Sequence, residues 1–397
     1  MNLFTRLMRQ PLSIIGFAIL LVVVIVAFLG SLIRPDASVH ASQQNMSLTK
    51  LKPLTTVDLV RLKVNRKSIQ QPWHTRLFLG GVQPEFINVP FDTFYVKANE
   101  LTIVKNANKR HYHLADVFYA IDQLTLTALR KEDVGNYAFY NMENQLIETS
   151  ADQLESRLMA ETVYQKTYFL GTDALGRDML SRLMAGSALS LSIGFFSVLI
   201  AIVIGISIGV ISGYFGGYID LLLSWVINLF WSVPAILFVI MLTISLGTGW
   251  GALIIGIGMV LWVEMAQVIR QSVRSMREKE YIKASRLLGL SHTTILMKHI
   301  LPNLSAPIFV LAASTFADAI VLEAGLSFLG IGIEPPQPSW GNMIRESYGY
   351  IISEGSTHLA IIPSLALMIM VLAFVFLSQG LKDAMSFSFQ QKGRGSL

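Results

Sequence analysis

The chain contains no cysteine among its 397 residues, which excludes disulfide bonds, cysteine-based metal sites and thiol catalysis. Charged side chains are scarce, because Asp, Glu, Lys and Arg make up 14% of the sequence against about 25% in soluble globular proteins. No segment matches the phosphate-binding pattern G-x-x-x-x-G-K-[ST], so we expect no ATP hydrolysis by this chain. The net charge of +5 does not indicate a nucleic-acid partner, because the basic residues flank apolar runs and form no stripe interleaved with aromatic residues.

What the sequence has in abundance is long uncharged runs. A helix needs about 20 apolar residues to cross the ~30 Å core of a bilayer. We therefore predict an all-α polytopic membrane protein with about six spans, which leaves both termini on the same side. The runs are 11–33; 183–219, ending in a glycine-rich turn at 213–217; 221–263, divided into two helices at 246–251; 306–330; and 359–381.

The first run has the length of a membrane anchor. Its 23 uncharged residues exceed the 7–15 that are typical of a signal-peptide core. Cleavage near Ala41 is the alternative, and we expect the segment to be retained as a span.

The basic residues predict the orientation of the spans, because short cytoplasmic loops are enriched in Lys and Arg. The segment 270–298 holds seven basic residues and two acidic ones, whereas the loop near Gly249 has no charge and 331–357 has a single basic residue. The terminal segments are also basic. We therefore predict that 270–298 and both termini are cytoplasmic, the termini through Arg6, Arg9, Lys382, Lys392 and Arg394.

Residues 34–168 do not fit a simple helical bundle, since they carry 16 basic and 14 acidic side chains. Long domains cross the membrane regardless of their charge. Alternating apolar residues predict strands in 89–105 and 137–147, and helical spacing predicts a helix over 151–164 capped by Ser150. We predict an inserted α+β extracytoplasmic domain.

Two histidines in this domain, His111 and His113, would share one face of a strand. Paired surface histidines are usually unliganded, so we expect no metal site.

Small residues in the second span predict close helix packing. Gly205, Gly209 and Gly213 recur every four residues, a spacing that lets helix backbones approach each other in lipid. The seam could rock during transport or be static. Pro234 predicts a kink in the third span, which could line a pathway or simply be tolerated.

Carboxylates inside a span are costly, so each one requires an explanation. Glu264, Asp318 and Glu323 fall in the predicted fourth and fifth spans. They could face a watery cavity and attract a substrate ammonium, titrate as in a proton-coupled carrier, or hydrogen-bond to neighbouring helices. The first alternative makes them, with Pro234, candidates for a translocation path.

The segment 276–302 has the pattern of a helical hairpin. Good helix formers run from Met276 to Leu288, Gly289 allows a sharp turn, and a second helix is expected from Thr293 to about Pro302. The hairpin could dock on a partner or anchor at the membrane surface.

This segment resembles the coupling motif of ATP-binding cassette importer permeases, which reads E-A-A, three residues, Gly, and later L-P. Lys283 stands in the place of the initial Glu and Ser285 in that of the second Ala. The resemblance implies an ATPase-coupling loop made of Glu280, Tyr281, Lys283, Ala284, Ser285, Leu288, Gly289, Leu301 and Pro302.

Three further stretches, 170–178, 323–343 and 380–384, are similar to the C-type permeases of dipeptide, oligopeptide and nickel importers. The cluster of Asp173, Arg177 and Asp178 could bind a partner or pin its loop by ion pairing. The resemblance implies a type I importer fold with an outer-face loop made of Gly171, Thr172, Asp173, Gly176, Arg177, Asp178, Pro335, Pro336 and Trp340.

The resemblance also implies the partners. A B-type permease would complete a path for di- or oligopeptides, two cytoplasmic ATPases would carry ATP and Mg²⁺, and an extracytoplasmic binding protein would deliver the solute. The chain itself would hold no cofactor and would lie in the lipid bilayer of the bacterial inner membrane. Nickel chelates or another small solute are alternative substrates; a proton-coupled carrier or a membrane-anchored sensor are alternatives of another class. The expected domains are 1–33, 34–168, 169–386 and 387–397.

Overall fold

A computed structural model describes residues 10–66, 81–97, 100–121 and 136–394. Contacts divide the chain into two compact units. The helical unit comprises 1–28, 186–346 and 363–397, and the α+β unit comprises 29–185 and 347–362. Arg6 and Arg9 lie outside the described residues.

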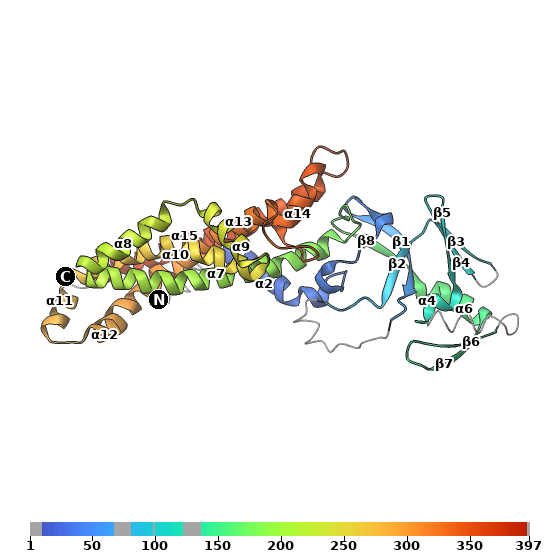
Figure 1. The fold of residues 1–397 in the computed structure, drawn as a ribbon, viewed down its shortest axis with the longest axis horizontal. Helices are drawn as coiled ribbons and strands as arrows, with labels where there is room; N and C mark the ends of the chain where they lie inside the picture. Colours follow the sequence, from blue (N-terminus) through green and yellow to red (C-terminus); the bar gives the residue numbers. More distant parts are fainter. Residues whose placement is uncertain (1–9, 67–80, 98–99, 122–135, 395–397) are drawn as a thin grey trace. The chain divides into compact units, whose positions relative to one another are not determined.

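The helical unit is built from long apolar helices (Figure 1). Within the described part of the chain, five helices are long and apolar enough to cross a membrane, and a sixth candidate is a pair of helices bent by 86°. The predicted first span is confirmed at both ends. The bounds are α2, Pro11–Ile33; α7, Met179–Phe215; α8, Gly217–Trp231; α9, Ala235–Leu246; α10, Trp250–Arg277; α11, Glu280–Leu287; α12, His292–Ile295, followed by a π turn, Leu296–Ile300; α13, Leu301–Phe328; α14, Trp340–Ser347, followed by a 3-10 turn, Tyr348–Tyr350; and α15, His358–Arg394.

The packing of α2 on α15 determines whether the bent pair crosses the membrane. A β-carbon on Gly380 of α15 would touch Ser13 near the start of α2, and one on Gly16 would touch Ala373, so the two helices run antiparallel. The start of α2 and the end of α15 therefore lie at the same end of the helical unit. A chain that begins and ends on the same side of a membrane crosses it an even number of times. The five single spans therefore require a sixth crossing, which the α8–α9 pair supplies.

The bent pair runs back along α10. Asp220 at the start of α8 is ion-paired with Arg270, while Val239 in α9 lies against Gly256, about 21 Å earlier along α10 at 1.5 Å per residue. The predicted kink at Pro234 is a complete break, because Ser232 to Pro234 separate two helices.

The described residues of the α+β unit form three antiparallel sheets with the strand orders β2-β1-β8, β3-β4-β5 and β6-β7. One core, between the first two sheets and the helices α4 and α6, buries Val60, Leu101, Ile103, Leu114 and Leu154. The bounds are β1, Thr55–Lys63; β2, Phe86–Pro90; β3, Thr93–Lys97; β4, Glu100–Lys105; β5, Asn108–His113; α4, Leu114–Phe118; β6, Asn136–Tyr140; β7, Leu146–Ser150; α6, Ala151–Arg157, followed by a π turn, Leu158–Thr162; and β8, Val163–Tyr168.

The predicted helix over 151–164 is partly wrong. It begins as expected, with Ser150 and Gln153 forming a reciprocal capping box, and after α6 ends at Arg157 the helical conformation continues through the π turn to Thr162. Val163 and Tyr164 instead begin β8 and pair with Val60 and Leu59 of β1. Tertiary pairing with a strand from the other end of the unit overrides the local helical spacing.

Two helix ends also differ from the prediction. The second arm of the 276–302 hairpin does not end near Pro302, because Pro302 lies in the first turn of α13, where a missing N–H costs no hydrogen bond. The last predicted span, 359–381, agrees with the candidate span His358–Met385, but its helix, α15, continues beyond the span to Arg394.

Candidate functional site

Residues 278–302 form a hairpin at one end of the helical unit, which we call the α11–α12 hairpin (Figure 1). Gly289 turns the chain between its arms with φ +77°, a conformation that favours glycine. The Ser291 side chain accepts a hydrogen bond from the Thr294 N–H and so caps α12. At the start of the hairpin, contacts with Lys283 and Arg277 lower the pKa of Glu278.

The two faces of the hairpin differ in burial. Ile282 of α11 and Ile295 of α12 are fully buried in a core with α7, α10 and α13. On the opposite side, Leu287 and Leu288 are 89% and 81% exposed. An apolar pair this exposed at the tip of a hairpin is suited to insertion into a partner's groove.

The predicted coupling residues take different positions in this hairpin. Ser285 is buried and its hydroxyl donates to the Tyr281 carbonyl at 2.7 Å, while Lys283 pairs with Glu278 at 3.4 Å. Leu301 and Pro302 begin α13. The remaining residues of the predicted set are exposed: Glu280, Tyr281, Ala284, Leu288 and Gly289.

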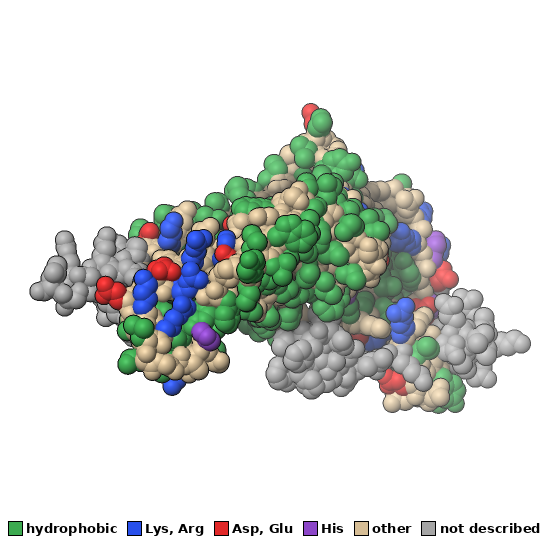
Figure 2. Space-filling view, turned by 60° about the vertical axis from the view of Figure 1, so that its left-hand side comes forward, with side chains coloured by type: hydrophobic (Ala, Val, Ile, Leu, Met, Phe, Trp, Pro, Cys, Tyr) green, Lys and Arg blue, Asp and Glu red, His purple; other side chains and the backbone are tan. Residues whose placement is uncertain are grey.

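Basic side chains surround this hairpin. Figure 2 shows a group of Lys and Arg side chains at the left, next to a surface that is largely hydrophobic. The basic residues of the segment are Arg270, Arg274, Arg277, Lys279, Lys283, Arg286 and Lys298.

The three glycines of the second span form a tight seam between α7 and α10. A β-carbon on Gly205 would lie 2.6 Å from Met265 Cγ, and one on Gly209 would lie 2.7 Å from the Ala266 carbonyl oxygen. Gly213 makes the equivalent approach to Arg270 and Val273. No larger side chain fits at these positions without separating the helices.

The three intramembrane carboxylates are not equivalent. Glu323 is fully buried and accepts hydrogen bonds from Ser190 of α7 at 3.0 Å, from Ser327 at 2.8 Å, and from Ser339 just before α14. Of the three alternatives for Glu323, this arrangement supports hydrogen bonding to a neighbouring helix, because Ser190 lies on α7. Glu264 and Asp318 are exposed instead, on α10 and α13, close enough for their charges to interact.

At the opposite end of the helical unit, the α9–α10 turn meets the segment before α14. The Thr248 hydroxyl donates to Glu334 at 2.6 Å. Pro335 and Pro336 are exposed and joined by a cis peptide bond, whereas Trp340 is 3% exposed. Of these three predicted outer-face residues, only the prolines are accessible.

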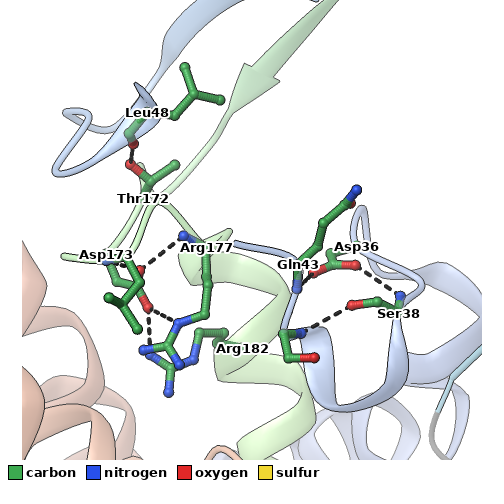
Figure 3. A network of polar contacts seen from close by, with 10 residues as sticks. Asp36, Ser38, Gln43, Leu48, Thr172, Asp173, Arg177 and Arg182 are labelled. Atoms are coloured by element: carbon green, nitrogen blue, oxygen red, sulfur yellow. Dashed lines mark hydrogen bonds and ion pairs between the residues drawn. The ribbon is translucent and has the colours of Figure 1, made fainter. Parts of the chain in front are cut away.

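The 171–178 turn of the α+β unit is held by buried ion pairs (Figure 3). The Asp173 carboxylate accepts from Arg177 Nε and Arg182 Nη1, both at 2.6 Å, and Asp178 pairs with Lys166 at 3.4 Å. Asp173, Arg177 and Asp178 are all less than 6% exposed. Their burial supports the pinning alternative over direct contact with a partner.

The segment 45–51 packs on this turn. The Thr172 hydroxyl donates to the Leu48 carbonyl, and Gly171 and Gly176 lie against the carbonyls of Leu51 and Asn45. Below the turn, burial and the nearby carboxylates of Asp178 and Asp36 raise the pKa of Tyr168. Residues 45–51 thus belong structurally with the turn, although the sequence places them in the insert.

The two strand histidines have protein partners. His111 Nδ1 lies 3.0 Å from the Thr102 hydroxyl, and His113 Nδ1 accepts from the Ala115 N–H at the start of α4. Among the residues that the structure describes, no three His, Asp or Glu side chains form a metal-ligating group.

Two contacts in the helical unit were not predicted from the sequence. Asp220 and Arg270 form a two-point ion pair at 2.5 and 2.8 Å, and Tyr214 hydrogen-bonds to His292 at 2.9 Å. Both pairs join residues at least 50 positions apart. The positive charge of 270–298 indicates in the sequence that acidic or polar partners are needed. It does not identify Asp220 or Tyr214 as those partners.

Known proteins resemble this chain in the helical unit. Residues 205–390 match the family of binding-protein-dependent transport system inner membrane components. The dipeptide transport system permease protein DppC of Alkalihalophilus pseudofirmus is 38% identical over 218 residues, 55% of this chain and 71% of that protein. The glutathione transport system permease protein GsiD of Pectobacterium atrosepticum is 35% identical over 218 residues, 55% of this chain and 72% of that protein.

Among solved structures, an inward-facing MetNI methionine ABC transporter matches 52% of this chain and 97% of its own with a TM-score of 0.44 and 19% identity. A likeness this weak supports no inference about the present chain.

The family match begins at residue 205, so the strands of the α+β unit lie outside it. The relatives, of which this chain spans more than two thirds, are permease subunits of transport systems, not enzymes. The membrane-spanning helices fit the same description. The chain belongs to the family of binding-protein-dependent transport system inner membrane components and is a multi-pass permease subunit of an ATP-binding cassette importer.

Proposed function

We propose that this permease imports di- or oligopeptides, that the α11–α12 hairpin is its docking element for a cytoplasmic ATPase, and that a second permease completes the path. The exposed Leu287 and Leu288 carry the docking proposal, because they project from a hairpin whose other face is fixed in the core. The peptide substrate rests on relatives named for dipeptide and glutathione transport.

The proposed orientation places the hairpin in the cytoplasm. The seven basic residues of 270–298 lie at the same end as the start of α2 and the end of α15. Short cytoplasmic loops carry such an excess of basic residues. ATP and Mg²⁺ then bind to the separate ATPases, on the side that the hairpin faces.

The exposed carboxylates Glu264 and Asp318 support a place on the translocation path. Two interacting like charges on apolar spans are costly against lipid, and water or a substrate ammonium lowers that cost. We do not propose Glu323 for the path, because its side chain is buried. The Pro234 break supports the same path, since interrupted helices in transporters surround binding sites.

The α+β unit is proposed to receive the extracytoplasmic binding protein. Its strands follow α2 in the chain. In the proposed orientation α2 begins in the cytoplasm, so the α+β unit lies on the outer side of the membrane. The family match does not include it, which supports a role added to the shared permease machinery.

Docking is tested by changing Leu287 and Leu288 together to Glu in the tagged full chain purified from its native membrane. Because both side chains are exposed, the change leaves folding intact while it places charge in the apolar contact. We expect the ATPase that co-purifies with the wild-type chain to be lost, together with uptake of radiolabelled dialanine. Ile352→Glu, at a position 96% exposed in the α+β unit, is the matched control and retains the ATPase.

Full ATPase recovery with the double variant would contradict docking at this hairpin. Uptake of glutathione but not dialanine by the wild-type complex would replace the proposed substrate by another peptide-like solute.

A further inference from the structure

Tyr214, near the end of α7, lies beneath both arms of the α11–α12 hairpin. Its side chain is 2% exposed, although it is close to the end of a span. The next two residues after α7's last turn, Gly216 and Gly217, have positive φ and redirect the chain into α8. The contacts of this buried tyrosine reach both arms of the hairpin and the end of α10.

Each arm of the hairpin contacts Tyr214 through a different side chain. From α12, His292 Nδ1 lies 2.9 Å from the Tyr214 hydroxyl, and the two rings meet edge to face at 5.6 Å. From α11, the Arg286 guanidinium lies 4.7 Å from the centre of the tyrosine ring. The Arg277 guanidinium at the end of α10 donates to the Tyr214 carbonyl at 3.4 Å.

The apolar surroundings fix the hairpin less specifically than these contacts do. Ile282 and Ile295 share a core with Tyr214, and apolar packing alone permits sliding and rotation. A hydrogen bond restricts both, because it weakens steeply with distance and angle. His292 is itself exposed, and its ring also lies 5.8 Å from that of Phe215 of α7, so the tyrosine hydroxyl supplies the directional contact between this arm and α7.

From Tyr214 the contacts continue into the spans. Gly216 lies against Arg277, and a few residues later Asp220 of α8 pairs with Arg270 of α10 at 2.5 and 2.8 Å. Because the hairpin is held at Tyr214, its displacement is passed to α7, α8 and α10 together.

We propose that Tyr214 is a positioning residue for transport, whose hydrogen bond to His292 makes the hairpin and α7 move as one body. The inference rests on the proposed docking of the ATPase at this hairpin, and it specifies which residue passes the motion to the spans.

The test measures the rigidity of this joint directly. The chain has no cysteine, so spin labels attach only at introduced sites. We choose Met297→Cys on the hairpin and Val203→Cys on α7, which are 61% and 59% exposed and lie away from the proposed docking leucines. The label-to-label distance is measured in the assembled complex, with cysteine-free partners, without nucleotide and with ATP and vanadate.

The wild-type background should give one narrow distance distribution in both states. Tyr214→Phe keeps the ring that packs against Arg286 and removes only the hydroxyl. The population of hairpins displaced from α7 should rise about fivefold, the factor that corresponds to about 1 kcal/mol for one hydrogen bond. ATP hydrolysis should continue while the dialanine taken up per ATP falls by a similar factor.

Changes at His292 supply the matched controls. His292→Asn retains a side-chain amide near the position of Nδ1 and should keep the narrow distribution, whereas His292→Leu should match Tyr214→Phe. The double change Tyr214→Phe with His292→Leu should be no worse than either single change. A narrow distribution in Tyr214→Phe, or additive effects in the double variant, would overturn the proposal.

Loss of the proposed function gives a different pattern. If the hairpin is not the docking element, Leu287→Glu with Leu288→Glu leaves the ATPase bound whatever the spin labels report. If only the Tyr214 proposal fails, that double variant loses the ATPase while Tyr214→Phe keeps the joint rigid.

Discussion

At the scale of single residues, burial separates side chains that the sequence grouped together. Glu323 is enclosed by three serine hydroxyls, two of them at 3.0 and 2.8 Å, and is fully buried. Because these bonds come from α7, from α13 itself and from the segment before α14, the carboxylate fastens three parts of the helical unit. Glu264 and Asp318 do not join parts of the helical unit in this way, since both are exposed.

We expect Glu323→Ala to lower the thermal unfolding temperature of the full chain. The substitution leaves buried hydroxyls unsatisfied, and each such group costs about 1–3 kcal/mol. Glu323→Gln keeps an acceptor and should lie much closer to the wild type. The measurement is thermal unfolding in lipid nanodiscs.

The exposed carboxylates are the control for this experiment. Asp318→Ala should unfold at the wild-type temperature and affect dialanine uptake instead. A stability loss at Asp318 equal to that at Glu323 would show that burial does not distinguish the two residues.

At the scale of helices and strands, the spans were predictable and the strands only partly so. The run 11–33 matches α2 because hydropathy along one helix requires no knowledge of its neighbours. The strand β1, at the centre of its sheet, was missed. It buries Leu59 on one face and Val60 on the other, so it lacks the simple alternation of a half-buried strand.

The hairpin illustrates the same limit within a predicted element. Helical propensity and Gly289 predicted two arms and a turn, which the structure contains. The contact between Tyr214 and His292 joins residues 78 positions apart, and nothing in the local sequence of either residue indicates the other.

The α7–α10 seam gives a prediction at this scale. Gly209→Val should destabilise the chain by about 1–3 kcal/mol, the cost of overpacking, because a β-carbon there already lies 2.7 Å from the Ala266 carbonyl oxygen. Gly209→Ala should give a smaller loss. The check is thermal unfolding together with dialanine uptake.

Gly325 of α13 is the matched control, because no atom lies within 4 Å of a β-carbon built there. Gly325→Ala should be neutral or slightly stabilising, as expected for alanine replacing glycine within a helix. Equal effects of alanine at 209 and 325 would rule out a close-packed seam.

At the scale of the whole molecule, the α+β unit covers 29–185 and 347–362, which includes both the strands and the 171–178 turn. Residues 45–51 pack on the 171–178 turn, so they belong with the segment that precedes α7. The strands of this unit begin with β1 and end with β8, where Thr55 and Tyr168 are direct cross-strand partners and Leu48 shares a core with both strands.

This adjacency permits a clean excision. Replacing 56–167 by two glycines should leave the ion pairs of Asp173 and the α11–α12 hairpin in place. We expect the shortened permease to co-purify with its ATPase and to lose uptake of dialanine that depends on the binding protein. Unchanged uptake would remove the insert from the delivery of solute.

The pairing of Thr55 with Tyr168 also bears on how such a permease arises. The two ends of the insert lie side by side in one ladder, and the Leu54 N–H donates to the Tyr168 carbonyl at 2.9 Å. A permease with a short turn at this position already holds the two chain ends together. A domain joined to a permease through such adjacent ends could be gained or exchanged as one cassette, without rearranging a membrane helix.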